Sequence, residues 1–250
     1  MEWRDEGIIL GVRRHGETSA IVEAMTRAHG RHLGLVRGGR SRRQQPILQP
    51  GNRVDLLWRA RLDEHLGTFN VEGVDLQAGR LMGSAVGVHG LQLLAAHLRL
   101  LPERDPHGGL FETMGVVMAH LDNPEACGEL LVRFELRVLE ELGFGLDLAE
   151  CAATGARDDL TYVSPRSGRA VSRSAGEPWH DKMLSLPVFL RVGSRQAATL
   201  AELEAAFRLT GFFFNRHVYE TRGLREPESR QSLLNAIRRS MAPRQGAPAA

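Results

Sequence analysis

The chain has 250 residues, 42% of them hydrophobic and 25% charged, which is the composition of an ordinary soluble globular protein with one large or two small domains. Its formal net charge of +2 excludes a general polycation, and its two cysteines are too few for a disulfide framework. The sequence has no apolar run of about 18 residues that would predict a membrane span. The acidic start, Met1 to Glu6, lacks the pattern of a signal peptide. We therefore expect a protein of the reducing cytoplasm.

The first 79 residues predict a β domain. Short runs with the spacing of strands occur at Gly7–Val12, Ser19–Arg27, Arg31–Val36, Arg53–Leu62 and Gly67–Leu76. Five short strands in about 75 residues, with a longer loop after the third, predict a small closed barrel. A five-stranded Greek-key barrel of the oligonucleotide-binding type fits this pattern. An SH3-like barrel fits nearly as well, and periodicity does not separate the two.

A basic stretch follows the third of these strands. Residues 31–43 contain five arginines and no acid, and between Arg27 and Arg61 nine arginines face one acid, Asp55, a local excess of +8. Guanidinium groups are planar donors that suit phosphate oxygens, and Gly38 and Gly39 allow the backbone to approach a partner closely. A solvated basic loop would have the same composition, but its place at the end of a barrel strand favours nucleic-acid binding. The residues predicted to bind DNA are Arg13, Arg14, Arg31, Arg37, Arg40, Arg42, Arg43, Arg53 and Arg59.

Binding through arginine and phosphate carries no sequence information. If about five arginines contact phosphates, the salt slope for single strands is about −3.5, a loss of roughly a hundredfold in affinity between about 50 and 200 mM salt. Stacking of bases needs exposed aromatic side chains. Trp58 and Phe69 lie in predicted strands and Trp3 outside them, and each has the pattern of a core residue. We therefore expect binding through the backbone, indifferent to sequence.

Near Gly79 the apolar period changes from two to about 3.6, which predicts a helical domain. Helices are expected over Met82–Leu101, over Leu110–Leu121, from Asn123-Pro124 to Gly143, from the capping box at Thr199 and Glu202, and from Pro227. The predicted fold class is thus α+β with several domains. Its parts are a barrel over 1–79, a helical domain over 80–240 with a loop-rich insertion at 146–190, and a disordered tail at 241–250.

Four stretches of the chain resemble the RecO family of bacterial recombination and repair proteins. They are Glu6–Leu10 with the following Ser19–Met25, Leu35–Arg43 leading into Leu48–Pro50, Arg133–Phe144 ending at Cys151, and Tyr162–Gly168 with the later Pro227–Arg230. They occur in family order and span most of the chain, to about residue 238. The third stretch is the most specific.

The resemblance implies an oligonucleotide-binding barrel followed by a helical domain. It implies a non-enzymatic protein of the RecFOR pathway that binds single- and double-stranded DNA, anneals complementary strands and helps load RecA onto coated DNA. The implied partners are RecR and the acidic, apolar-ended C-terminal tail of single-strand DNA-binding protein, and the implied place is the cytoplasm, at the nucleoid. No membrane contact and no cofactor are expected.

One part of the resemblance is incomplete. Many members of the family carry four cysteines in a zinc-binding element, whereas this chain keeps Cys151, has Thr154 at the next expected position, and has no cysteine over Val171–Ala175. A structural zinc site needs four sulfur or nitrogen ligands, and the distant His180 cannot complete the set. We predict no zinc and an element held by packing alone. Its expected apolar anchors are Tyr162, Pro165 and Trp179.

Arg133 and Arg137 lie four residues apart beside the apolar stripe of Phe134. They could pair with nearby glutamates such as Glu129 and Glu141. Alternatively, with the resemblance in view, Arg133, Phe134 and Arg137 could form a basic rim that accepts an acidic peptide end.

Other candidate sites are weak. His29-x-x-His32 lacks a third metal ligand nearby and is read as a turn pair. No P-loop, GxSxG, HExxH or GxGxxG motif occurs, so no enzyme active site is predicted. Three rival functions stay open at this point: an RNA-binding or ribosome-associated barrel, an enzyme that clamps a phosphorylated substrate, and an interaction scaffold whose basic loop binds an acidic protein.

Overall fold

The computed structural model of the chain describes residues 1–242. The chain divides into two compact units, Met1–Asp122 and Asn123–Ala250. The tail predicted at 241–250 falls almost wholly outside the described residues, and Met241 still belongs to the last helix.

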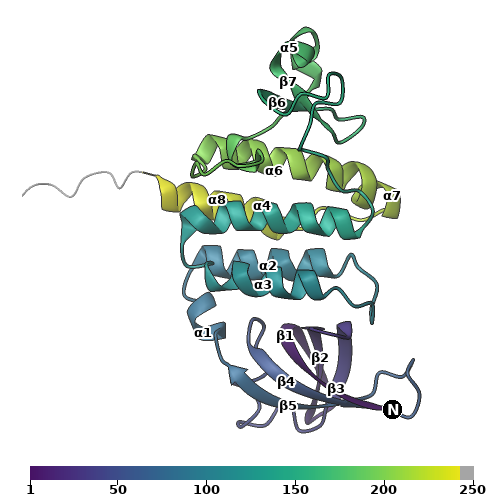
Figure 1. The fold of residues 1–250 in the computed structure, drawn as a ribbon. Coiled ribbons are helices and arrows are strands. Elements are labelled where there is room, and N and C mark those ends of the chain that lie inside the picture. The colour runs from purple at the N-terminus through teal and green to yellow at the C-terminus, as the bar shows by residue number, and fades with distance from the viewer. Residues whose placement is uncertain (243–250) are drawn as a thin grey trace, which may run out of the picture. The chain divides into compact units, whose positions relative to one another are not determined.

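The first unit begins with five strands that form a closed barrel in the order β1-β2-β3-β5-β4 (Figure 1). Neighbouring strands are antiparallel except β3 and β5, which are parallel and meet where Leu35 faces Thr68. The long first strand pairs with both β2 and β4, which closes the sheet. The strands are β1 Glu2–His15, β2 Ser19–Thr26, β3 Gly30–Val36, β4 Arg53–Arg59 and β5 Thr68–Asp75.

Alternation along the strands places the core inside the barrel. In β4, Val54, Leu56 and Trp58 are buried while the residues between them are partly exposed, as the period of two predicts. Gly34 of β3 leaves room for the ring of Phe69, since a Cβ at this position would lie 2.3 Å from it. The five predicted strands are therefore confirmed, although β1 is longer than predicted at both ends, from Glu2 to His15, and β4 ends earlier, at Arg59.

Three helices complete the first unit: α1 Ala78–Leu81, α2 Ala85–Leu98 and α3 Gly108–Ala119. Within this unit α2 packs on β1 and α3 on β2. The helix predicted over Met82–Leu101 is shorter because Ser84 caps its start by accepting a hydrogen bond from the Gly87 N–H at 2.9 Å. The change of period near residue 79 thus marks the end of the barrel. A domain boundary at this point stays a prediction, since the compact unit continues to Asp122.

Three long helices of the second unit, α4, α6 and α8, pack side by side (Figure 1). The Asn123 side chain accepts a hydrogen bond from the Ala126 N–H at 3.3 Å, and Gly143 has a φ of +86° just beyond the end of α4, so both predicted ends of this helix are confirmed. The capping box of Thr199 and Glu202 is also present. The helical elements are α4 Pro124–Glu141, α6 Leu200–Phe214, the π-helical η3 Asn215–Tyr219, α7 Glu220–Arg222 and α8 Glu228–Met241.

The insertion contains a small sheet that the sequence did not predict, with strand order β7-β6-β8. Its interior holds Cys151, Val163 and Leu186, all almost fully buried. The anchor role predicted for Trp179 is wrong, because 56% of this residue is exposed and it lies on a 3₁₀ turn. Tyr162 is half-buried, with its ring against Gly176 and its hydroxyl donating to Glu177 at 3.2 Å. The elements are β6 Leu160–Val163, β7 Ala170–Ser172, α5 Arg173–Gly176, η1 Glu177–Lys182, β8 Leu184–Ser185 and η2 Val188–Leu190.

Candidate nucleic-acid interface

The arginine loop, residues 37–45, leaves the barrel at the end of β3 and is fastened to the turn between β1 and β2. The Arg40 N–H donates to the Thr18 carbonyl at 3.0 Å, and the Arg40 guanidinium donates to the carbonyls of Glu17 at 2.5 Å and Gly16 at 3.3 Å. The adjacent Gly39 needs its lack of a side chain, since a Cβ there would lie 2.9 Å from the Cβ of Ala20.

Five arginines around this loop keep an un-neutralised charge. Their side chains are exposed, and within residues 1–242 none of them forms an ion pair or a hydrogen bond through its guanidinium. Arg40 also keeps its positive charge un-neutralised, because its guanidinium donates to backbone carbonyls and not to carboxylates. The five are Arg13 and Arg14 at the end of β1 and Arg37, Arg42 and Arg43 in the loop.

Three of the predicted DNA-binding arginines lie in ion pairs on the barrel instead. The Arg31 side chain is only 11% exposed and contacts Glu23 at 3.0 Å and Glu103 at 3.4 Å. Arg59 pairs with Glu2 at 2.7 Å. Arg53 pairs with Glu6. Because their charge is already compensated, we leave Arg31, Arg53 and Arg59 out of the proposed interface.

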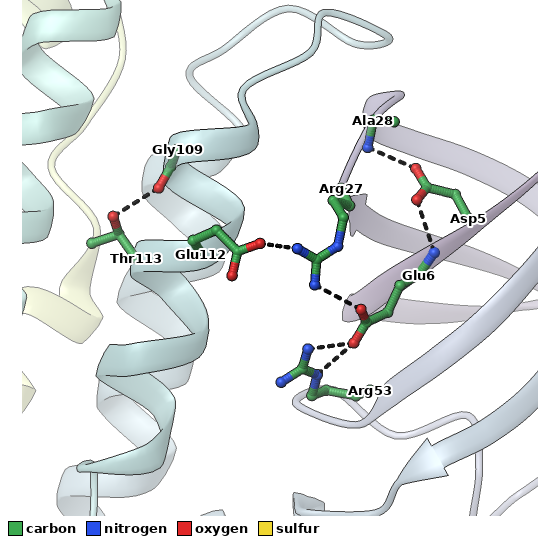
Figure 2. Close-up of polar contacts among 8 residues, drawn as sticks. All are labelled: Asp5, Glu6, Arg27, Ala28, Arg53, Gly109, Glu112 and Thr113. Carbon is green, nitrogen blue, oxygen red and sulfur yellow. Dashed lines mark hydrogen bonds and ion pairs between the residues drawn. The ribbon is translucent and has the colours of Figure 1, made fainter.

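Glu6 also binds a second arginine. Figure 2 shows Arg27 between Glu6 of β1 and Glu112 of α3, with Arg53 on the same Glu6 carboxylate. Partial burial acts to raise the pKa of Glu6, but the hydrogen bonds from Arg27 and Arg53 outweigh it and lower the pKa below its usual value. These arginines therefore stabilise the first unit, whereas its exposed arginines without a carboxylate partner lie in the arginine loop, at the end of β1 and at Arg61.

Two clefts flank the arginine loop. The larger, of about 680 Å³, lies on the side of the β1–β2 turn and is lined by Arg14, Arg40 and Glu17 among others. The smaller, of about 320 Å³, lies on the side of β4 and β5 and is lined by Arg37 and Arg59 among others. The surface around the loop is thus both basic and concave.

Two family profiles match the chain. One is described as the N-terminal part of recombination protein O and covers residues 1–76, and the other as its C-terminal part and covers residues 89–226. The chain is 70% identical to the DNA repair protein RecO of Mesorhizobium japonicum over 244 residues, covering 98% of this chain and 96% of that one. It is 66% identical to the RecO of Chelativorans sp., covering 99% and 100%, and 62% identical to that of Brucella abortus, covering 96% and 98%.

The chain belongs to the RecO family of DNA repair proteins. The resemblance seen in the four sequence stretches is thereby confirmed. None of the helices within residues 1–242 has the length and apolarity needed to cross a bilayer.

The aromatic side chains of the barrel belong to its core. Trp58 is fully buried and Phe69 is 4% exposed. Trp3, contrary to the prediction, lies inside a strand, where its ring stacks on His29 with centroids 4.1 Å apart and on Trp58 at 5.6 Å. These three rings offer little open face for base stacking.

His32 lies buried in the same cluster, and it makes the stability of the barrel depend on pH. Burial lowers the pKa of His32 from 6.5, more than its hydrogen bond to the Leu33 carbonyl raises it. The unfolded chain therefore binds a proton at a higher pH than the folded chain, and stability is lost as the pH falls below about 6.5. We expect the free energy of unfolding to fall by up to about 1.4 kcal/mol for each pH unit between about pH 6.5 and the lowered pKa.

Urea unfolding between about pH 5 and 7.5, followed by tryptophan fluorescence, measures this dependence. In the His32→Phe variant, the part of the pH dependence of the unfolding free energy that comes from His32 should be lost. His120→Gln, a change at an exposed histidine, should retain it. A native slope that His32→Phe leaves unchanged would contradict the assignment to His32.

The helical residues predicted to bind a partner peptide have different environments. Phe134 is fully buried in the second unit and offers no surface to a peptide, so it is excluded from the proposed contact. Arg133 donates to the Phe189 carbonyl at 2.7 Å, and Arg137 pairs with Glu140 at 2.5 Å and with Glu141 at 3.8 Å. The pairing expected between Arg133 and Glu129 does not form, because Glu129 accepts the Ala198 N–H at 2.6 Å. Both arginines remain exposed on one side of α4.

The residues present at the degenerate zinc element do not fit a zinc ion. The Cys151 Sγ lies 3.4 Å from the Ser172 Oγ and accepts the Ser172 N–H at 3.2 Å. Within residues 1–242 no three His, Cys, Asp or Glu side chains gather as a metal site. His29 instead contacts Asp5, with 2.9 Å between Nδ1 and Oδ2.

Proposed function

We propose that the chain is a DNA-binding recombination mediator that binds single- and double-stranded DNA and anneals complementary strands without covalent chemistry. The observation that carries this proposal is the gathering of five un-neutralised arginines, with Arg40, around one loop of the barrel. Each free guanidinium can bind a phosphate and release a condensed counterion. The arginines thereby reduce the repulsion that opposes the pairing of two DNA strands.

The barrel itself is proposed to be of the oligonucleotide-binding type. Its strand order β1-β2-β3-β5-β4, with β3 and β5 parallel, supports the Greek-key barrel of that class over the SH3-like alternative. In this reading β3 is a rigid base from which the arginine loop projects. The barrel holds the arginine loop in place, and the loop supplies the positive charge that binds DNA.

The second unit is proposed to tether the protein to coated DNA. Arg133 is exposed on α4 and its guanidinium donates to the Phe189 carbonyl, not to a carboxylate, so its charge suits the acidic tail of single-strand DNA-binding protein. Arg137 already pairs with Glu140 and Glu141 and is left out of this contact. With RecR as a further partner, this contact would bring the arginine loop to coated strands and assist the loading of RecA. The proposed place of action is the nucleoid.

Annealing of complementary strands, naked and coated with single-strand DNA-binding protein, tests both units. The variant Arg37→Ala/Arg42→Ala/Arg43→Ala spares Arg40, which holds the β1–β2 turn. It should anneal both substrates at least about tenfold more slowly, since each lost charged hydrogen bond weakens binding. Arg133→Glu should slow annealing of the coated strands alone.

Native annealing no faster than the uncatalysed reaction would refute the proposed function. Equal slowing of naked and coated strands by Arg133→Glu would refute the tether. A preference for RNA in direct competition would favour the RNA-binding alternative.

A further inference from the structure

The arginine loop acts as a ridge between the two clefts. Gly38 to Ser41 and Gln45 line the larger cleft, whereas Arg37 and Gln44 line the smaller one. The far walls belong to opposite sides of β3, because β2 is its neighbour on one side and β5 on the other. A single extended strand would have to cross the ridge to occupy both clefts.

Each side of the ridge has its own cation, and the crest adds two more. Arg14 is the cation without a carboxylate partner in the larger cleft, where Arg40 adds charge and Glu17 opposes it. Arg37 has the same role in the smaller cleft, where the charge of Arg59 is compensated by Glu2. Arg42 and Arg43 are exposed on the loop and line neither cleft.

The floors of the clefts differ in kind. Val12, Ala20, Leu48 and Pro50 give the larger cleft an apolar side that can cover the face of a base. Gln44, Thr68 and Asn70 give the smaller one polar groups that can bond to sugar or phosphate oxygens. Neither cleft floor has a fixed set of hydrogen-bond donors that would select one base. This agrees with DNA binding that does not depend on sequence.

We propose that each cleft holds one DNA strand, so that a single copy of the chain carries two strands side by side, with Arg42 and Arg43 on the ridge between them. This inference rests on the proposed function and adds to it the number and the place of the bound strands. The ridge brings two backbones close while its guanidinium groups offset their mutual repulsion. Annealing then requires only that the bases of the two strands meet across the crest.

Two oligothymidylates of about 15 nucleotides, one carrying a donor dye and the other an acceptor, test the inference because they cannot pair with each other. Native mass spectrometry counts the strands bound by one copy of the chain, and energy transfer reports two strands on it. The native protein should bind two strands. Arg14→Glu and Arg37→Glu should each bind one, with energy transfer reduced at least about tenfold and the affinity for the remaining strand within about threefold of native.

The double variant Arg14→Glu/Arg37→Glu should lose both strands, and Arg208→Glu, an exposed change of the same charge on α6, should retain both. One strand per native chain, with binding otherwise intact, overturns the two-strand inference and leaves the proposed function standing. Equal loss of both strands in each single variant overturns it too, because it shows one continuous site. Absence of DNA binding by the native protein overturns the proposed function as well.

Discussion

Replacing Arg37, Arg42 and Arg43 by alanine is expected to reduce the affinity for single-stranded DNA by about a hundredfold at about 0.1 M salt. The expected salt slope changes from about −3.5 in the native chain to about −1.4 in the variant. Fluorescence anisotropy titrations of an oligothymidylate at several salt concentrations measure both quantities.

The physical reason is the release of counterions. Each phosphate neutralised on a single strand contributes about 0.7 to the slope of log affinity against log salt. Five exposed arginines without carboxylate partners account for the native slope, which in the two-strand arrangement is the sum over both bound strands, and the loop supplies three of them. Three contacts at about 0.7 each amount to about two log units between 1 M and 0.1 M salt.

The control variant changes three arginines of the same unit that already have acidic partners. Arg4 pairs with Asp55, Arg80 with Asp122 at 2.9 Å and Arg99 with Glu23 at 2.7 Å, and none of the three lines either cleft. Replacing these three by alanine changes the net charge by the same amount but should leave the salt slope near its native value. A control slope as shallow as that of the loop variant would show that overall charge, and not the loop, determines binding.

The barrel and its loop could be predicted from the sequence because their signals are local. Alternation in β4 and the turn at Pro50-Gly51-Asn52 are contained within a few residues. The glycines that give the arginine loop its backbone freedom can likewise be recognised within a few residues of sequence. Gly38 has a φ of +66°, a backbone conformation that glycine alone adopts without strain.

The pairing of Arg31, Arg53 and Arg59 could not be predicted, because it depends on the register between strands. Glu2 lies directly across from Arg59 in the β1–β4 ladder, although 57 residues separate them in sequence. A run of basic residues gives no indication of which carboxylates the fold brings to it. The sequence therefore could not show which of these arginines already have acidic partners in the fold.

The small sheet of the insertion was missed for another reason. Its strands, Leu160–Val163, Ala170–Ser172 and Leu184–Ser185, are too short to show a period of two. Trp179 was assigned to the interior on the strength of its residue type, but large aromatic side chains also occur on surfaces.

A second large effect is expected in the second unit, where Glu135 of α4 and Arg230 of α8 form a buried ion pair. Glu135 is fully buried and the Arg230 side chain is 12% exposed. The Arg230 Nε donates to Glu135 at 2.9 Å, and its terminal nitrogens donate to Glu226 at 2.9 Å and to the Thr210 hydroxyl at 3.0 Å. Thr210 in turn donates to Glu135. The pair therefore links α4, α6 and α8.

The variant Arg230→Met should lower the free energy of unfolding of this unit by about 3–5 kcal/mol, because it leaves the Glu135 carboxylate buried without its cation. The desolvation cost of the carboxylate remains while its attraction is lost. Urea unfolding followed by circular dichroism measures the loss. Hydrogen exchange of the amides in α4, α6 and α8 locates it.

The double variant Glu135→Leu/Arg230→Met removes both charges and should regain a large part of the loss, since a buried ion pair replaced by apolar side chains is often neutral in stability. Glu140→Gln on the same helix breaks an exposed pair with Arg137 and should cost less than about 1 kcal/mol. The single variant Glu135→Leu measures the cost of removing the carboxylate alone. If the double variant is less stable than Arg230→Met by that full cost, the two residues act independently. In the proposed function this coupling matters as well, because α4 carries Arg133, and a loosened α4 would no longer hold Arg133 in one fixed position.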